Sequence, residues 1–241
     1  MKRRALSAVI ACAAAVIAGI LLLPATAQAR VSEYQVQFLP LGQTGASEVI
    51  VNVVLSPETR LPATVTVPLP AGAQVLWSGE ILGGDPQADP FRQPSVVPTA
   101  GALAAVFRLE QKPIAQVEAS IGQPTVRGDA VSSSLRWVNT GEEGTYTFSV
   151  VLQAGARNVR IKPTPVGEPN RNAAGETLYV LSPVRLARGQ VFEVSVEYER
   201  GAAGARPSTA RTPVLPVVAA ALGVALIALV LVLRAERAKR A

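Results

Sequence analysis

The 241-residue sequence contains no histidine, and its one cysteine and one methionine are Cys12 and Met1. Sites for haem, copper, zinc or an iron–sulfur cluster need imidazole, thiolate or thioether ligands. The chain beyond residue 12 offers none of these groups, so we expect no cofactor and no such metal site. The same absences exclude disulfide bonds within that region and the Ser-His-Asp and Cys-His arrangements of nucleophilic enzymes.

Lysine is also scarce, and only Lys112 and Lys162 lie between residues 30 and 212. The catalytic machinery that remains is a serine activated by lysine or a pair of carboxylates. Lys162 follows no serine-bearing motif, and the acidic pair Glu142-Glu143 falls in an expected hairpin turn. We therefore expect a protein that is not an enzyme.

The formal net charge of +6 does not indicate a nucleic-acid-binding surface. Of the 23 basic residues, three lie in the first four positions and four in the last eight, which leaves sixteen between residues 30 and 212. Of the 17 acidic residues only Glu236 lies outside that span, which also leaves sixteen. This region is formally neutral, so we expect no nucleic-acid partner.

The N-terminal segment has the organisation of an export signal. Basic residues at positions 2–4 precede an apolar run over residues 5–23, and Ala27-Gln28-Ala29 forms a small-x-small cleavage site. We expect a signal peptide over residues 1–29. An uncleaved signal anchor stays an alternative because the apolar run is long. Lipidation is another alternative, because Val9-Ile10-Ala11-Cys12 resembles a lipobox, although it lies inside the apolar run and not at its end.

A second apolar segment, Val214 to Leu233, contains no charge and is long enough to span a bilayer as one helix. Basic residues follow it at once in a short tail, residues 234–241, and positive flanks favour the cytoplasmic side. We expect a single-pass protein of the bacterial cytoplasmic membrane with its ectodomain outside the cytoplasm. The bacterial source is indicated by arginine outnumbering lysine 19 to 4, as GC-rich codon usage produces.

Residues 201–213 are rich in small residues without a period, which predicts a flexible stalk. Within the membrane helix, Ala219 and Gly223 are four residues apart, a spacing that permits close packing of two helices and thus a helix-mediated oligomer.

The region between the signal and the stalk has the pattern of β-strands throughout. Phe192, Val194 and Val196 alternate with Glu193 and Ser195, which is typical of a half-buried strand of an antiparallel sandwich. Short runs rich in β-branched and aromatic residues are separated by Gly, Pro, Asn and Asp. Eleven strands are expected, over residues 31–39, 48–55, 63–69, 74–81, 104–109, 114–121, 131–138, 145–152, 158–162, 177–181 and 191–198.

The strand region also resembles itself at an offset of 83 residues. Val67 to Ala73 matches Val150 to Ala156 in its Ala-Gly-Ala turn, and Gly84-Asp85-Pro86 meets Gly167-Glu168-Pro169. A common offset favours a duplicated unit. Short turn strings recur by chance in alanine-rich sandwiches, which is the alternative. We expect tandem β-sandwich domains over residues 30–122 and 123–200.

Residues 143–148 place Tyr146 in a strand directly after Gly144. This segment resembles the tyrosine corner of immunoglobulin-like and fibronectin-like domains, where a tyrosine hydroxyl bonds back to the chain. The resemblance implies an all-β, immunoglobulin-like antiparallel β-sandwich without the cysteine pair of true immunoglobulin domains, and it implies no ligand. We expect a structural role for Tyr146 and a core position for Trp137, whereas Trp77 has weaker apolar flanks and is a less certain core residue.

Two loops stand out by length and composition, residues 83–92 and 167–176. Loops at the ends of a sandwich commonly carry its binding residues. Asp85 and Asp89 of the first loop, with nearby carbonyl groups, could ligate calcium. Two carboxylates are fewer than calcium usually takes, so an ordinary solvated loop is the favoured interpretation. The candidate binding residues are Asp85, Asp89, Phe91, Arg92, Asn170, Arg171 and Asn172.

Three classes of function follow from these observations. The leading hypothesis is a non-enzymatic surface protein whose ectodomain binds a protein or an envelope polymer. A second is an accessory subunit that assembles a membrane complex through its helix. A third, an envelope enzyme acting on glycans, would require paired carboxylates in a cleft.

Overall fold

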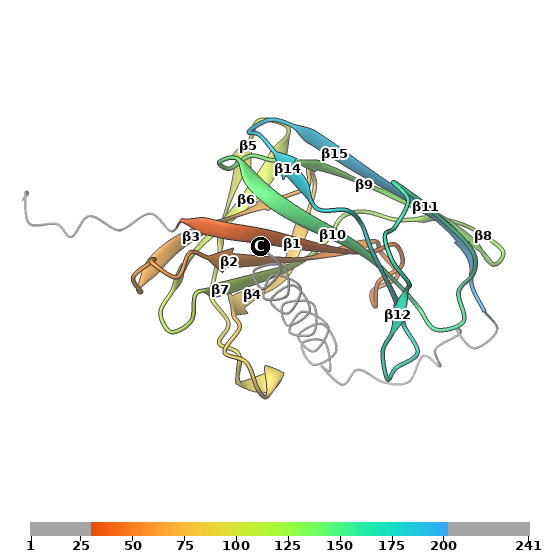
Figure 1. The fold of residues 1–241 in the computed structure, drawn as a ribbon, viewed down its shortest axis with the longest axis horizontal. Helices are drawn as coiled ribbons and strands as arrows, with labels where there is room; N and C mark the ends of the chain where they lie inside the picture. The colour runs from red at the N-terminus through yellow and green to blue at the C-terminus, as the bar shows by residue number, and fades with distance from the viewer. Residues whose placement is uncertain (1–29, 202–241) are drawn as a thin grey trace, which may run out of the picture.

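The computed structural model describes residues 30–201, and this part of the chain is all-β with one short 3-10 helix, η1 (Pro86–Ala88) (Figure 1). Short strands and tight turns follow the runs expected from the sequence. The strands are β1 (Val31–Leu39), β2 (Glu48–Leu55), β3 (Ala63–Leu69), β4 (Gln74–Glu80), β5 (Ser95–Thr99), β6 (Ala102–Leu109), β7 (Ile114–Ser120), β8 (Thr125–Arg127), β9 (Ala130–Val138), β10 (Gly144–Leu152), β11 (Arg157–Lys162), β12 (Asn170–Arg171), β13 (Thr177–Val180), β14 (Val184–Leu186) and β15 (Val191–Glu199).

These strands form three sheets. The largest has eight strands. Seven follow the order β12-β13-β10-β1-β2-β7-β4, and the eighth, β14, pairs with the first residues of β10 on the same edge as β13. A four-stranded sheet has the order β11-β15-β9-β8, and a three-stranded sheet has the order β3-β6-β5. In Figure 1 the strands β5, β6, β9 and β15 of the two smaller sheets lie above the central strands β1, β2 and β10 of the large sheet, which gives a sandwich-like arrangement of layers.

The core lies between the large sheet and the two smaller ones. Alternate residues of β1, such as Val36 and Phe38, face it together with Phe148 and Val150, their partners on β10. One cluster of buried apolar side chains therefore includes residues from both ends of the described chain. Burial of these side chains, each worth roughly 1.5–3 kcal/mol, is the main stabilising contribution of the fold.

The pairing of β1 with β10 is parallel, whereas every other strand pair of the described residues is antiparallel. The expected domain boundary between residues 122 and 123 lies in the connection between β7 and β8. Strands from both sides of that boundary join in the large sheet. The large sheet therefore combines strands of both halves, because β10 of the second half pairs with β1 at the edge of the first-half strands. The division into two tandem domains stays a prediction.

The offset of 83 residues nevertheless has a counterpart in the turns. Gly72 and Gly155 both have positive φ, 74° and 81°, and the next residue of each turn donates its N–H over 3.3 Å to the carbonyl three residues earlier. Each turn carries the chain into a different sheet. The strand order β2-β7-β4 in the large sheet is repeated by β9-β15-β11 in the four-stranded sheet.

Aromatic side chains fill the core where β1, β9 and β10 meet. The rings of Tyr34 and Tyr146 stack with centroids 4.4 Å apart, and Trp137 packs edge-on against Tyr146 and Phe148. Trp137 is fully buried, which confirms its expected core position. Tyr146 is fully buried too, and its hydroxyl donates to the Asn139 side chain over 2.7 Å rather than directly to a backbone carbonyl.

The expected signal peptide, membrane helix and cytoplasmic tail lie outside the described residues. Within residues 30–201 no helix has the length and apolar character that crossing a membrane requires.

Candidate functional site

The second face of the large sheet carries polar side chains, although the opposite face of the same strands is apolar. Side chains alternate between faces along a strand, so Gln35 and Gln37 of β1 point away from the core. Registers extend each of them into a row across five strands. One row is Thr147, Gln35, Asn52, Gln116 and Gly79; the other is Ser149, Gln37, Ile50, Glu118 and Trp77. We call these two rows the polar face.

The amides of the polar face are buried without partners. Gln37 and Asn52 are 0% exposed, and within residues 30–201 neither side chain has a hydrogen-bond partner for its oxygen or its nitrogen. The side-chain oxygens of Gln35 and Gln116 and the hydroxyl of Ser149 are in the same condition. An unsatisfied buried polar group costs about 1–3 kcal/mol, so this face lowers the stability of the described fold unless something binds to it.

The two rows end at an aromatic edge on β4. A bulge between Val75 and Trp77 shifts the register and turns Trp77 onto the polar face, where it lies opposite Glu118. The far end of the indole ring covers Gly79, since a Cβ added there would lie 2.6 Å from two ring carbons. Only glycine leaves room for this ring position.

Phe91 reaches the same edge from the loop after β4. It forms an isolated antiparallel bridge with Gly79, so both residues belong to the same face of the sheet. The Phe91 side chain is 54% exposed. The structure thus places one predicted loop residue, Phe91, beside Gly79, whose partner on the other side is Gln116 of β7.

The environment of Glu118 changes its acidity. The pKa of this carboxyl is raised to about 7. Burial is the largest cause, the Gln116 amide opposes it by donating a hydrogen bond over 2.8 Å, and the charge of the nearby Glu48 adds to the rise. Near neutral pH the group therefore carries a proton in a large fraction of the molecules and can then donate a hydrogen bond.

Three further candidates of the first loop have local hydrogen-bonding partners. Asp85 accepts from the backbone of Gln87 at the start of η1, and Asp89 accepts from the backbone of Leu82 over 2.8 Å. Burial raises the pKa of Asp89, and Asp85 raises it further by its charge. Arg92 pairs over 2.7 Å with the carboxylate of Glu80, which is fully buried. These contacts shape the loop.

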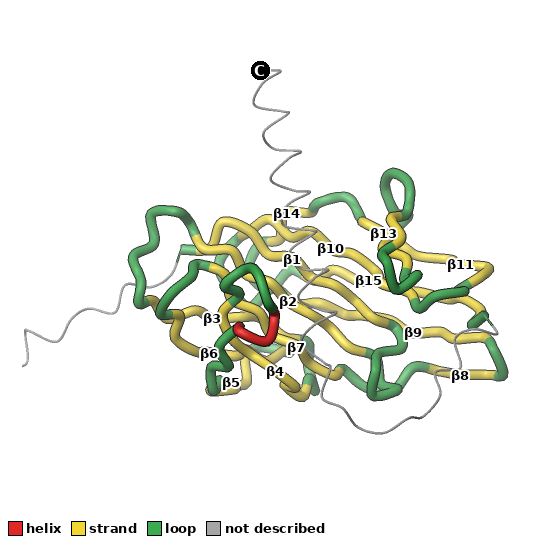
Figure 2. The backbone as a smooth tube through the Cα atoms, turned by 90° about the horizontal axis from the view of Figure 1, so that it is seen from below, coloured by secondary structure: helices red, strands yellow, loops and turns green. Residues whose placement is uncertain are grey.

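The candidate residues of the second loop lie in a short strand and in a closed turn. Asn170 and Arg171 form β12 at the other edge of the large sheet, and both are exposed. Asn172 exchanges side-chain and backbone hydrogen bonds with Glu176 and closes a turn. Figure 1 shows both loops on the lower side of the large sheet, opposite β9 and β15. Figure 2 shows η1 next to β4 and β7 and separate from β13. The two loops therefore flank the polar face at its opposite edges and do not meet.

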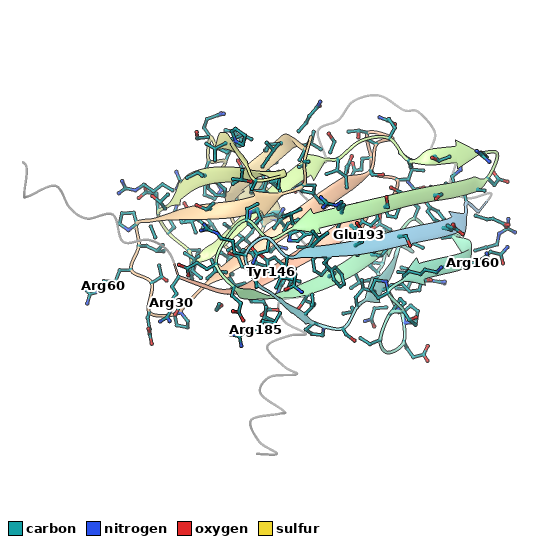
Figure 3. All side chains as sticks on the ribbon, turned by 90° about the horizontal axis from the view of Figure 1, so that it is seen from above. Arg30, Arg60, Tyr146, Arg160, Arg185 and Glu193 are labelled. Atoms are coloured by element: carbon teal, nitrogen blue, oxygen red, sulfur yellow. The ribbon has the colours of Figure 1, made fainter. Side chains whose placement is uncertain are left out.

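A second polar surface lies on the outer face of the four-stranded sheet. Exposed Ser132, Ser134 and Ser195 lie along its centre, and hollows of about 550 and 490 Å³ lie beside them. Figure 3 shows Arg160 and Glu193 on this part of the molecule. Arg136 and Glu193 pair at 3.6 Å, and both are exposed. Arg160 likewise lies opposite Glu197 in the register, and exposed opposite charges of this kind are typical of a solvated surface.

Comparison with known proteins gives no relative by sequence: no family model matches the chain, and no curated protein does. Among solved structures, native leukotriene A4 hydrolase from Saccharomyces cerevisiae is similar with a TM-score of 0.39 and 6% identity, over 70% of this chain and 29% of that chain. A second structure of native yeast LTA4 hydrolase gives a TM-score of 0.38 and 6% identity, over 70% and 28%. The chain spans less than a third of those proteins, and a likeness this weak supports no conclusion about activity.

Proposed function

We propose that this chain is an exported, single-pass membrane protein whose ectodomain is a non-enzymatic binding module for a protein or an envelope polymer. The observation that supports it most is the polar face: a broad set of amide and hydroxyl groups without partners in the described residues, next to an aromatic edge. Buried polar groups are normally hydrogen-bonded, so this set of unpartnered groups requires an explanation, and a binding partner would provide one.

The rest of the proposal follows from composition and topology. Two immunoglobulin-like units are joined through β1 and β10 in the sheet that carries the polar face, and the apolar helix of residues 214–233 holds them at the outer side of the cytoplasmic membrane. Glu80 and Asp89 are used as structural acceptors. Glu118 and Glu48 lie close enough to interact, but both are buried, and Glu48 accepts from Thr44 while Glu118 accepts from Gln116. This use of carboxylates favours binding over glycan hydrolysis.

In-cell crosslinking of the full-length protein tests the proposal, with mass spectrometry of the captured material. A matched control carries an unrelated membrane span in place of residues 214–233. Partners that are retained after the swap support an ectodomain binding module. Partners that are lost after the swap contradict it and favour the second candidate, an accessory subunit assembled through its helix, which the four-residue spacing of Ala219 and Gly223 permits.

A further inference from the structure

We propose that the stalk, residues 201–213, binds across the polar face of its own chain, with its arginines at the carboxyl groups of Glu48 and Glu118. The sequence analysis treats this segment as a free spacer. Bound in this way, the stalk covers the polar face, and an outside partner reaches that face only by displacing it. The contact itself is independent of the proposed binding function, whereas the competition with a partner rests on it.

The polar face is closed to solvent, although the described strands do not lie on it. The two smaller sheets pack on the opposite, apolar side of the large sheet, and the two loops stay at its edges (Figure 1). Gln35, Gln37 and Asn52 in the middle of the polar face are nevertheless 0–1% exposed. An antiparallel sheet with one face on the core normally keeps the other face wet. This burial therefore requires a cover that the described strands do not supply.

The place where the described chain ends favours the stalk as that cover. The backbone of Gly201 packs on Gly155, since a Cβ added at Gly201 would collide with the Gly155 carbonyl. Gly155 lies in the turn after β10, and in the same turn Gln153 donates over 3.1 Å to the carbonyl of Leu41, just after β1. Glu48, at the start of β2, pairs with the last residue of β1. The chain thus leaves the described fold at the end of the large sheet where Glu48 lies.

The stalk is also long enough to cross the face. Residues 202–213 span at most about 40 Å when extended, at about 3.3 Å per residue. The five strands of the polar face, at about 4.8 Å separation, are roughly 19 Å wide. The expected signal peptide over residues 1–29 is removed on export, so the C-terminal segment is the part of the chain that remains to cover the face.

The charges of the two surfaces are complementary. Glu118 lies on the polar face, and Glu48 lies in the next row, two residues from its neighbour Ile50. Strands β10, β1, β2, β7 and β4 contain no lysine or arginine. The stalk supplies Arg206 and Arg211 and contains no acidic residue. A guanidinium beside a buried carboxyl group favours its ionised form, and it donates several hydrogen bonds in one plane.

An extended peptide also suits the unpartnered amides. Each peptide unit offers an N–H donor and a carbonyl acceptor, which match the oxygen and the nitrogen of a carboxamide. Gln37 and Asn52 have both of these side-chain atoms without a partner. The stalk is built mainly from Ala, Gly, Ser and Thr, so its backbone can approach the sheet closely, and Pro207 disfavours a helix there.

Electron paramagnetic resonance of a nitroxide attached at Thr209→Cys tests the proposal in the full-length protein in detergent. Cys12→Ser makes the label position the only cysteine. A label on a free stalk moves on the nanosecond timescale or faster, whereas a bound stalk slows it several-fold. We expect slow motion in the otherwise unchanged protein, and fast motion once Glu48→Gln and Glu118→Gln are combined, because the arginines then lose both carboxylates.

Glu193→Gln with Glu197→Gln is the matched control, since it removes two exposed carboxylates from the outer face of the four-stranded sheet and should leave the label slow. Arg206→Gln with Arg211→Gln should release the stalk without touching the described fold, so it keeps the test informative where the Glu48 and Glu118 changes unfold the protein.

Fast motion of the label in the unchanged protein overturns the proposal, and so does slow motion that the arginine substitutions leave unchanged. The in-cell crosslinking tests the binding function separately, because capture of a partner does not depend on the mobility of the stalk.

Discussion

Replacing Glu80 by alanine should destabilise the protein strongly, although the residue lies at the end of a strand. Its carboxylate accepts hydrogen bonds from the backbone of Glu110, Gln111 and Lys112 over 2.7–3.0 Å, and it binds the Arg92 guanidinium over 2.7 Å. The side chain is 0% exposed. It therefore ties the β6–β7 connection and the Phe91 segment to β4.

The magnitude follows from the donors left behind. Three N–H groups and one guanidinium lose their acceptor, and each is worth about 1 kcal/mol in a typical protein. The total of about 4 kcal/mol agrees with the roughly 3–5 kcal/mol lost when one member of a buried ion pair is removed. Urea unfolding at pH 7, followed by Trp137 fluorescence, measures this difference in the full-length protein in detergent.

The pH dependence gives the same experiment a second readout. Burial opposes ionisation of Glu80, but the backbone donors and Arg92 outweigh it and lower its pKa below the usual value of 4.5. The contribution of the carboxylate is therefore complete above pH 4.5 and is lost as the pH falls through the lower pKa of the folded state.

Glu110→Ala is the control, because its pair with Arg108 is exposed on both sides and is worth less than about 1 kcal/mol. A loss below about 1 kcal/mol for Glu80→Ala at pH 7 would refute this account of the loop.

Three further predictions concern single residues. Glu118→Gln should stabilise the protein at pH 8 by up to about 3 kcal/mol and have little effect at pH 4.5, because the raised pKa makes the folded state lose stability between pH 4.5 and about 7; urea titrations at the two pH values check this. Asn139→Ala should cost about 3 kcal/mol, since its side chain bonds the Tyr146 hydroxyl and three backbone groups, whereas Tyr146→Phe should cost about 1 kcal/mol; equal losses in thermal unfolding would contradict this difference. Gly79→Ala should lose about 1–3 kcal/mol through collision with Trp77 and the Pro90 carbonyl, and an unchanged melting temperature would show that the indole does not cover Gly79.

The all-β class and most strands were predictable because each half-buried strand alternates apolar and polar residues. The prediction for residues 191–198 differs from β15 by only one residue. The strands β5, β8, β12 and β14 were missed, since β5, β8 and β12 have no buried residue and β14 has only one, Leu186, so that none shows an alternating pattern. Local sequence carries no such signal for edge strands, which are held by their neighbours.

The pairing of β1 with β10 was not predictable either, because it joins residues more than a hundred positions apart. Without it the two halves of the chain resemble separate sandwiches. The polar face had a weaker signal that could have been used: Gln35 and Gln37 alternate with Tyr34, Val36 and Phe38 in β1. The pattern indicates two faces, but only the registers show that Gln35 continues into Asn52 and Gln116.

The loop residues divide for a physical reason. Composition suggested binding for all seven candidates, yet most of the short polar ones bond to nearby backbone, as Asp and Asn commonly do in turns. Phe91 cannot make such bonds and is left exposed at the sheet edge. Of the candidates in the first loop, Phe91 is therefore the one that makes no local hydrogen bond with its side chain, whereas the acidic residues of that loop are used as local acceptors.

Site-specific photocrosslinking in cells tests the central claim most directly. A benzoylphenylalanine at position 91 keeps an aromatic side chain at the edge of the polar face, and the same group at Val126, which is 44% exposed on β8, probes the far sheet. The account predicts that the ligand or partner is captured from position 91 and not from position 126. Capture from position 126 alone, or equally from both positions, would contradict it.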